Sequence, residues 1–387
     1  MGLSTGGLNG QRFLVTTVLA DDFRDRFLKG VRENAFLAVP DAADGELRHG
    51  WVDVFKPAST LFELDTFLFD RFVCLTLRVD KKTVNGMYRK ITLTERLAAV
   101  RKLRDVKKLS KAEKTDVIEA LDAELFGRAL PSVATVDVAW DTQSGQVIVF
   151  STSETLVELV KVRFETTFEV HLQPERMVDW LVGAMTWDEI GQRAESFSEA
   201  RGCRGLGAGL DGKDDSLEGA RFEVATDFIT WLWFQSEASD KSFKDADLTL
   251  WLETRLKLQD MAVTDSPDTT ILLGVAPSGT EAARQNLHTG KRPVEARLGL
   301  KLGYMECGLT LIATPDGIAV TGMKLPFEIK EGQDEKIHER MLLLDLMHET
   351  LKKLFQQFFV ARTSPEWDKS MQAWLDTDLA ASTVAPQ

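Results

Sequence analysis

The sequence has few of the features that define a secreted or membrane protein. Its three cysteines, Cys74, Cys203 and Cys307, are far apart and odd in number. We therefore expect no disulfide framework and a reducing compartment. No apolar run approaches the roughly 18 residues that cross a bilayer. The first residues, 1–11, are glycine-rich and uncharged, unlike a secretory signal. These absences predict a cytoplasmic protein with no membrane partner.

Motifs for metal-dependent and nucleophilic catalysis are also missing. The five histidines have no metal-ligand spacing, and His348-Glu349 lacks the second histidine of a zinc-protease helix. The sequence contains no G-x-S-x-G elbow and no convincing nuclease set of carboxylates and lysine. Because catalytic groups can also converge from distant positions, this absence is weak evidence. We predict that the protein is not an enzyme and needs no cofactor.

One glycine-rich stretch, GAGLDGKD at 207–214, imitates a nucleotide-binding loop. It fits G-x-G-x-x-G and nearly fits the phosphate-loop pattern. However, Asp214 stands where a hydroxyl should hold magnesium, and Asp211 and Asp215 would repel phosphate. No apolar strand precedes the stretch. This context favours a linker, and a nucleotide-using enzyme that depends on Lys213 stays open as an alternative.

The charge of the chain is unevenly distributed. The net charge of -13 argues against nucleic acid, because phosphate binding needs cations. However, residues 80–114 contain twelve Lys or Arg and four Asp or Glu, a local charge of +8 that leaves -21 elsewhere. An acidic body with one basic segment is typical of a protein that offers phosphates a restricted surface. The alternative is an ordinary solvated helical face.

Local patterns predict an α+β protein with antiparallel-rich sheets, flanking helices and several lobes, because helices and strands come in runs. We expect strands at 12–18, 50–55, 72–79, 166–172, 227–235, 248–258, 294–302 and 308–313, and a hairpin at 134–150. We expect helices at 23–33, 93–108, 111–126, 153–163 and 333–360. The tryptophans Trp231, Trp233 and Trp251 lie in expected strands, which favours packing in the core or at a subunit interface over stacking on bases.

These elements divide the chain into five contiguous segments. We expect a β-rich lobe at 1–80, a basic helical pair with a β-hairpin at 81–180, a glycine-rich insertion or linker at 181–220, an α+β lobe at 221–362 and a tail at 363–387. The last residues, 380–387, should be disordered.

The basic segment is expected to form two helices. Thr92 with Glu95, and Ser110 with Glu113, have the spacing of capping boxes that would begin them. In the first helix, Leu93, Leu97, Val100 and Leu103 form an apolar stripe, and Arg101, Arg104 and Lys108 form a separate basic stripe. One face can therefore pack while the other presents cations.

The order of these elements resembles the recombination-associated RdgC family. The resemblance rests on KKLSKAEK at 107–114 between the basic helices, Arg128-Ala129-Leu130, and the turn WDTQSG at 140–145. Upstream, Gly50-Trp51-Val52 is similar to a short family element. Downstream, Thr289-Gly290-Lys291, the turn Asp316-Gly317 and a long C-terminal helix follow in the family's order.

The resemblance implies a ring-shaped, RdgC-like homodimer that encircles double-stranded DNA with little sequence preference. It also implies association with the nucleoid and modulation of recombination, because occupied DNA is less accessible to the RecA recombinase. An apolar subunit contact is implied at Leu130. The expected DNA-binding cations are Lys81, Lys82, Arg89, Lys90, Arg96, Arg101, Lys102, Arg104, Lys107, Lys108 and Lys111. A protein-binding regulator, whose basic segment docks an acidic partner, stays open as a second reading.

Overall fold

The computed structural model describes residues 2–3, 7–37, 47–198, 218–237, 242–243, 248–260, 267–314, 317–325 and 332–376. The chain divides into two compact units, each assembled from separated segments. Unit 1 contains Met1–Thr16, Trp140–Glu154 and Leu172–Gln387, and unit 2 contains Thr17–Ala139 and Thr155–His171. The sequence-based division, by contrast, used contiguous segments.

Unit 1 is built on an antiparallel sheet whose strands run in the order β10-β9-β11-β12-β13-β1-β6. Inward residues alternate with outward ones along β9 and β12, as expected for strands with one covered face. The strand bounds are β1 Leu8–Leu14, β6 Gln146–Val149, β9 Leu248–Asp260, β10 Thr269–Leu273, β11 Lys291–Leu302, β12 Met305–Thr314 and β13 Gly317–Lys324. Two short strands, β7 Gln173–Pro174 and β8 Ser242–Phe243, pair with β1 and β9.

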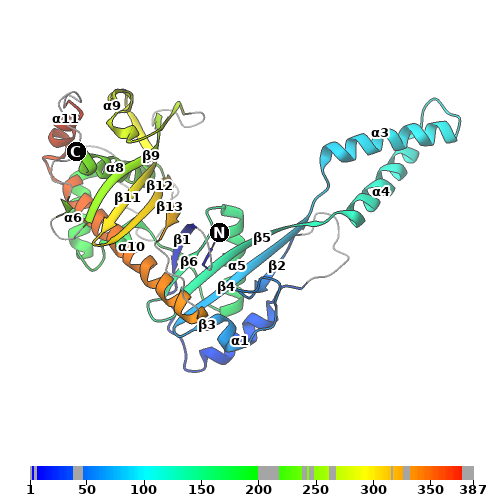
Figure 1. Ribbon diagram of the computed structural model, residues 1–387, viewed down its shortest axis with the longest axis horizontal. Helices are drawn as coiled ribbons and strands as arrows, with labels where there is room; N and C mark the ends of the chain where they lie inside the picture. The colour runs from blue at the N-terminus through cyan, green and yellow to red at the C-terminus, as the bar shows by residue number, and fades with distance from the viewer. Residues whose placement is uncertain are drawn as a thin grey trace. The chain divides into compact units, whose positions relative to one another are not determined.

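Two long helices form the aromatic core of unit 1. Helix α8, Glu218–Glu237, packs on β9, β11, β12 and β13 and also contacts α10, Gln333–Arg362 (Figure 1). The expected strand at 227–235 is therefore wrong, since this segment is helical. Its β-branched and aromatic residues imitate a strand, but a helix buried between a sheet and another helix is also apolar on most sides. Trp231 and Trp233 are buried in the core as expected.

Unit 2 combines strands β2, Leu47–Val52, and β4, Phe72–Lys82, with helices α1, Phe23–Glu33, and α5, Glu154–Phe168. Short elements α2, Leu64–Phe67, and β3, Leu68–Phe69, lead into β4, and β5, Pro131–Asp141, lies beside β4. The Nε1–H of buried Trp51 donates to Thr167 Oγ1 at 2.8 Å, which ties β2 to α5. The strand expected at 166–172 is wrong because α5 continues to Phe168.

Two glycines are required by close backbone approaches. A Cβ at Gly50 would lie 2.5 Å from Phe36 Cα, so only glycine lets β2 pass the chain there. Gly145 has a φ of +76°, and its Cβ would lie 2.3 Å from Val15 O. Gly145 closes the turn between β5 and β6, and the hairpin expected at 134–150 is confirmed.

A helical hairpin is inserted between β4 and β5 of unit 2. It consists of α3, Gly86–Leu103, and α4, Lys111–Arg128 (Figure 1). The predicted start of the first helix is wrong: α3 begins seven residues earlier, where the Asn85 side chain accepts bonds from Met87 N and Tyr88 N. The second start is confirmed, since Ser110 and Glu113 form the predicted capping box.

The segments expected to be linker and tail contain further helices of unit 1. Helix α6, Trp187–Ser198, lies in the expected linker, and α11, Trp367–Leu375, lies in the expected tail. The 3₁₀ turns η1, Met177–Leu181, and η3, Pro277–Gly279, and helix α9, Glu281–His288, also belong to this unit. The protein is α+β, as predicted. None of the helices in the described ranges has the length and hydropathy needed to cross a membrane.

Candidate nucleic-acid interface

The α3–α4 hairpin carries most of the predicted DNA-binding residues. Its turn, residues 104–110, lies at the end of the hairpin farthest from β4 and β5 (Figure 1). Asp105 in this turn has a φ of +49°, a left-handed conformation that Asp tolerates better than most residues. We name the end of α3, the turn and the start of α4, residues 101–111, the hairpin tip.

Little of the hairpin is buried. None of the residues of α3 is buried, and those buried in the turn and α4 are Leu109, Leu121 and Leu125. The predicted apolar stripe of α3 is only half-buried, and Leu103 at its end is 86% exposed. A hairpin with so small a core depends strongly on its caps and on polar contacts between its helices.

Three of the predicted DNA-binding cations are neutralised by carboxylates of α4. Arg89 donates from Nε and Nη2 to the two carboxylate oxygens of Asp122, at 2.5 and 2.6 Å. Arg96 forms an ion pair with Glu124, and Arg104 forms one with Glu113. Opposite charges that meet in this way cancel much of the field that each would offer to a phosphate.

The ion pairs also change the acidity of the carboxylates. Hydrogen bonds from Arg89 lower the pKa of Asp122 below its usual value. The pKa of Glu113 is lowered chiefly by its hydrogen bonds within the Ser110 capping box, with a smaller effect from Arg104. Both carboxylates are therefore charged over the whole neutral range.

The other predicted cations form no ion pair within the part of the chain that the structure describes. Seven of them are exposed and Lys82 is half-buried. They are Lys81, Lys82, Lys90, Arg101, Lys102, Lys107, Lys108 and Lys111. Five of the eight belong to the hairpin tip, Lys81 and Lys82 end β4, and Lys90 lies in the second turn of α3. The positive charge that is free to meet a phosphate is therefore concentrated at the tip.

The predicted stripe of Arg101, Arg104 and Lys108 is wrong as a helical feature. Helix α3 ends at Leu103, Arg104 is its C-cap, and Lys108 lies in the turn. Moreover, Arg104 is paired with Glu113. Patterning at i, i+3 and i+7 could not reveal where the helix ends, because no glycine or proline marks the boundary.

Sequence reasoning missed two features of the hairpin. The first is the acidic set on α4, whose Asp122 and Glu124 reach across to α3. The second is a group of exposed apolar residues at the start of α3, where Met87, Tyr88 and Ile91 are 66%, 58% and 52% exposed. Their i, i+1 and i+4 spacing was visible in the sequence, but the later predicted helix start placed them outside the helix.

The remaining predicted site residues lie elsewhere or outside the described ranges. Leu130 is 86% exposed just before β5, as a contact residue must be in an isolated subunit. The glycine-rich stretch 207–214 lies outside the described residues. Within the described residues, no group of three His, Cys, Asp or Glu side chains has the geometry to hold a metal ion. His348 instead bonds to Glu175 in unit 1, at 3.0 Å.

Compared with known proteins, the chain matches no protein-family model and no curated protein sequence.

Proposed function

We propose that this protein binds double-stranded DNA without sequence preference, chiefly through the hairpin tip. In this proposal the protein acts by occupying DNA, without catalysis and without a cofactor. The supporting observation is the concentration at the tip of exposed cations that form no ion pair with any residue the structure describes, in a chain whose net charge is -13. Outside the hairpin, the acidic surface would repel DNA and so restrict where it binds.

The chemistry of the tip favours phosphate contacts over base recognition. Five cations of the tip have no ion-pair partner among the described residues: four are lysines, Lys102, Lys107, Lys108 and Lys111, and the fifth is Arg101. An ammonium on a flexible stem interacts with phosphate as a point charge and lacks the planar fork that arginine uses on guanine. Phosphate contacts position a protein on the duplex but carry no sequence information.

A subunit contact at Leu130 belongs to the same proposal. Leu130, just before β5, and Val133, among the first residues of β5, are exposed by 86% and 51%. Exposed apolar residues in one place are typical of protein interfaces. With the resemblance to the RdgC family, they support a homodimer that closes around DNA, associates with the nucleoid and limits the access of RecA.

The test is duplex binding measured by fluorescence anisotropy at several salt concentrations. The tip variant replaces Arg101, Lys102, Lys107 and Lys108 by Gln. Because each phosphate contact releases about 0.9 of a counterion, this variant should bind unrelated duplexes more weakly and by a similar factor. The slope of log affinity against log salt should fall by up to about 4, roughly 1 per lost contact.

A matched control removes the same charge from elsewhere. It replaces four exposed lysines outside the hairpin that also form no ion pair with described residues, Lys56, Lys301, Lys324 and Lys353, by Gln. The control should keep the wild-type salt slope, because the net charge changes equally while the tip is intact. If the two variants lose affinity equally, only net charge matters and the tip is not the binding site.

The exposed apolar group Met87, Tyr88 and Ile91 favours a second candidate, a hairpin that docks an acidic protein partner. Such a regulator would have no salt-dependent affinity for duplex DNA, whereas the tip variant would lose affinity for the protein partner. The wild-type salt titration therefore separates the two candidates.

A further inference from the structure

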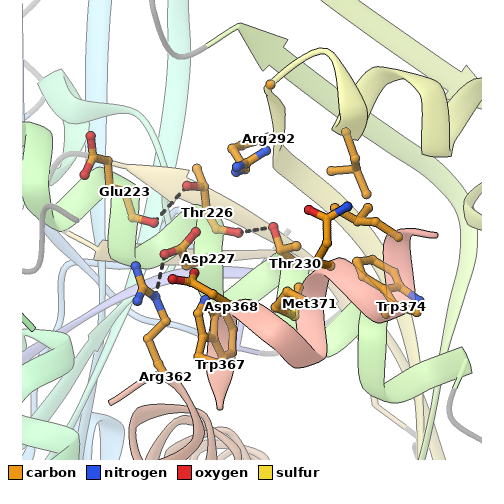
Figure 2. Close-up of a pocket in the computed structure, with 14 residues that line it drawn as sticks. Glu223, Thr226, Asp227, Thr230, Arg292, Arg362, Trp367, Asp368, Met371 and Trp374 are labelled. Carbon is orange, nitrogen blue, oxygen red and sulfur yellow. Dashed lines mark hydrogen bonds and ion pairs between the residues drawn. The ribbon is translucent and has the colours of Figure 1, made fainter. Parts of the chain in front are cut away.

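Unit 1 contains a cavity of about 600 Å³ that the proposed DNA-binding function does not use. It lies between α8, α11, the end of α9 and the start of β11 (Figure 2). Its volume is within the usual range of small-molecule sites, roughly 300–1,000 Å³. The polar groups that its walls present determine which ligand it can hold.

One wall is a single face of α8 that offers hydrogen-bond acceptors. Glu223, Thr226, Asp227 and Thr230 follow each other at helical spacing along it. The Thr226 hydroxyl donates to the carbonyl oxygen of Glu223, and the Thr230 hydroxyl donates to that of Thr226, both at 2.8 Å (Figure 2). Since a hydroxyl has one proton, both hydroxyl oxygens can only accept a further bond.

The two carboxylates of this wall retain free acceptor capacity. Asp227 accepts from Arg362 Nε through Oδ2 at 2.7 Å, and its Oδ1 has no hydrogen-bond partner among the described residues. The Glu223 carboxylate has neither an ion pair nor a hydrogen bond within the described ranges. Burial, with repulsion from Asp227, raises the pKa of Glu223 above its usual value. A bound cation would offset that repulsion.

The facing wall, on α11, combines four apolar side chains with the polar side chains of Asp368 and Gln372. Trp367, Met371, Trp374 and Leu375 line it (Figure 2). The Trp374 Nε1–H donates to Glu237 at 2.9 Å, so this indole presents only its ring to the cavity. The apolar side chains of this wall offer packing surface to the organic body of a ligand.

The arginines of the cavity do not make it an anion site. Arg362 is paired with Asp227, and its guanidinium lies 5.2 Å from the centre of the Trp367 ring. Arg292 donates to the Lys291 carbonyl oxygen at 3.1 Å, at one side of the cavity. An anion in the cavity would be opposed by the negative charges of Glu223 and Asp227, which line the same cavity.

We propose that this cavity binds a small organic cation, whose ammonium or guanidinium donates to the acceptor face of α8 while its apolar body packs against α11. The cation is either a free amine or the side chain of a basic residue in another polypeptide. A free amine and a basic side chain would donate the same charge-assisted hydrogen bonds to Glu223, Asp227 and the two threonines.

The experiment uses the full chain and calorimetric titration with three probes that share an indole ring. Tryptamine carries a cation, tryptophol is neutral and indole-3-propionate carries an anion. Tryptamine should bind most tightly and raise the melting temperature. N-acetyl-arginine amide, which represents an arginine side chain in a polypeptide, serves as the fourth probe. If it binds more tightly than tryptamine, the natural cation is the side chain of another polypeptide. If it binds more weakly, the natural cation is a free amine.

Two variants connect binding to the acceptor wall. Glu223→Gln removes the negative charge of this side chain and keeps its size and shape. It should weaken tryptamine binding by about tenfold, the usual effect of one charge-assisted hydrogen bond. The control Glu366→Gln removes a carboxylate of α11's N-cap that does not line the cavity, and should bind like the wild type. Equal binding of tryptophol, tighter binding of indole-3-propionate, no binding of either cation, or an unchanged Glu223→Gln variant would each overturn the proposal.

Discussion

Helices α3 and α8 have similar lengths, 18 and 20 residues, but opposite surroundings. On α8, Phe228, Ile229, Leu232 and Trp233 are completely buried between a sheet and α10. On α3 none of the residues is buried, and the helix is held by the Asn85 cap and by ion pairs to α4. The comparison indicates that α8 contributes mainly to stability, whereas α3 contributes a surface that is available to a partner.

The largest expected effect comes from truncating the buried helix. Phe228→Ala removes a ring that packs against Trp231, Phe355 and Phe358. The substitution should lower the free energy of unfolding by about 3–5 kcal/mol, measured by denaturant titration, because it leaves a cavity in a close-packed core. The matched change on α3, Tyr88→Ala, should stay within about 0.5 kcal/mol, since Tyr88 is 58% exposed. Similar losses in the two variants would remove the contrast between the helices.

A smaller effect is expected inside the hairpin. Leu121→Ala removes one of the three buried leucines and should destabilise the hairpin by about 2–4 kcal/mol. Because the hairpin has its own small core, this loss should appear as faster amide hydrogen exchange in α3 and α4 only. Faster exchange throughout β4 and β5 as well would show that the hairpin unfolds together with unit 2.

The contrast between the helices also explains which elements could be predicted from the sequence and which could not. The strands β9, β11 and β12 were predictable because they alternate, and α10 because its apolar positions recur with helical period. Helix α8 was misread as a strand because burial on most sides removes that period. Tertiary packing, which a single sequence does not display, decided its conformation.

At the hairpin, the sequence predicted which segment carries the positive charge. It did not predict which of its cations are neutralised by carboxylates and which can still bind a phosphate. Lys107 and Lys108 were recognisable as cations, and the structure leaves them without ion pairs in the described ranges. Arg89, Arg96 and Arg104 looked equivalent to them, yet all three meet carboxylates of α4. Which cations are neutralised depends on how α3 and α4 are rotated against each other, and no local pattern records that rotation.

An effect of pH is expected in unit 1, at the buried pair of His348 and Glu175. Burial, together with the positive charge of Arg12, lowers the pKa of His348 from its usual value near 6.5. Below pH 6.5, His348 therefore binds a proton in the unfolded chain but stays neutral in the folded protein until the pH reaches its lowered pKa. Stability should fall as the pH decreases from 6.5 towards the lowered pKa, by at most about 1.4 kcal/mol per pH unit.

The variant His348→Gln isolates this contribution, because glutamine can still donate to Glu175 but does not titrate. His49 has a pKa lowered mainly by burial and acts in the same direction, so the informative quantity is the difference between variant and wild type. The unfolding free energy of the variant should depend less on pH between 7 and 5. Parallel pH profiles would show that His348 keeps its ordinary pKa.

A small expected effect on stability tests the distinction between cations that form an ion pair and cations that form none with described residues. The double variant Arg89→Gln with Asp122→Asn removes an ion pair whose side chains are 40% and 27% exposed. Because the pair is partly solvated, its loss should cost the hairpin at most about 1 kcal/mol, seen as slightly faster hydrogen exchange in α3. The net charge is unchanged, so any change in DNA affinity reports on the pair itself.

Binding should separate this variant from Arg101→Gln, which removes one unpaired cation of the tip. The double variant should keep the wild-type affinity and salt slope, since a neutralised arginine releases no counterion from DNA. Arg101→Gln should flatten the slope by about 1. If Arg89 instead leaves Asp122 to bind phosphate, the double variant will show the flattened slope, and the DNA surface must then extend along α3 beyond the tip. An unchanged slope in both variants would show that neither Arg101 nor Arg89 contacts phosphate, and would leave the lysines of the tip as the contacts to test with the fourfold tip variant.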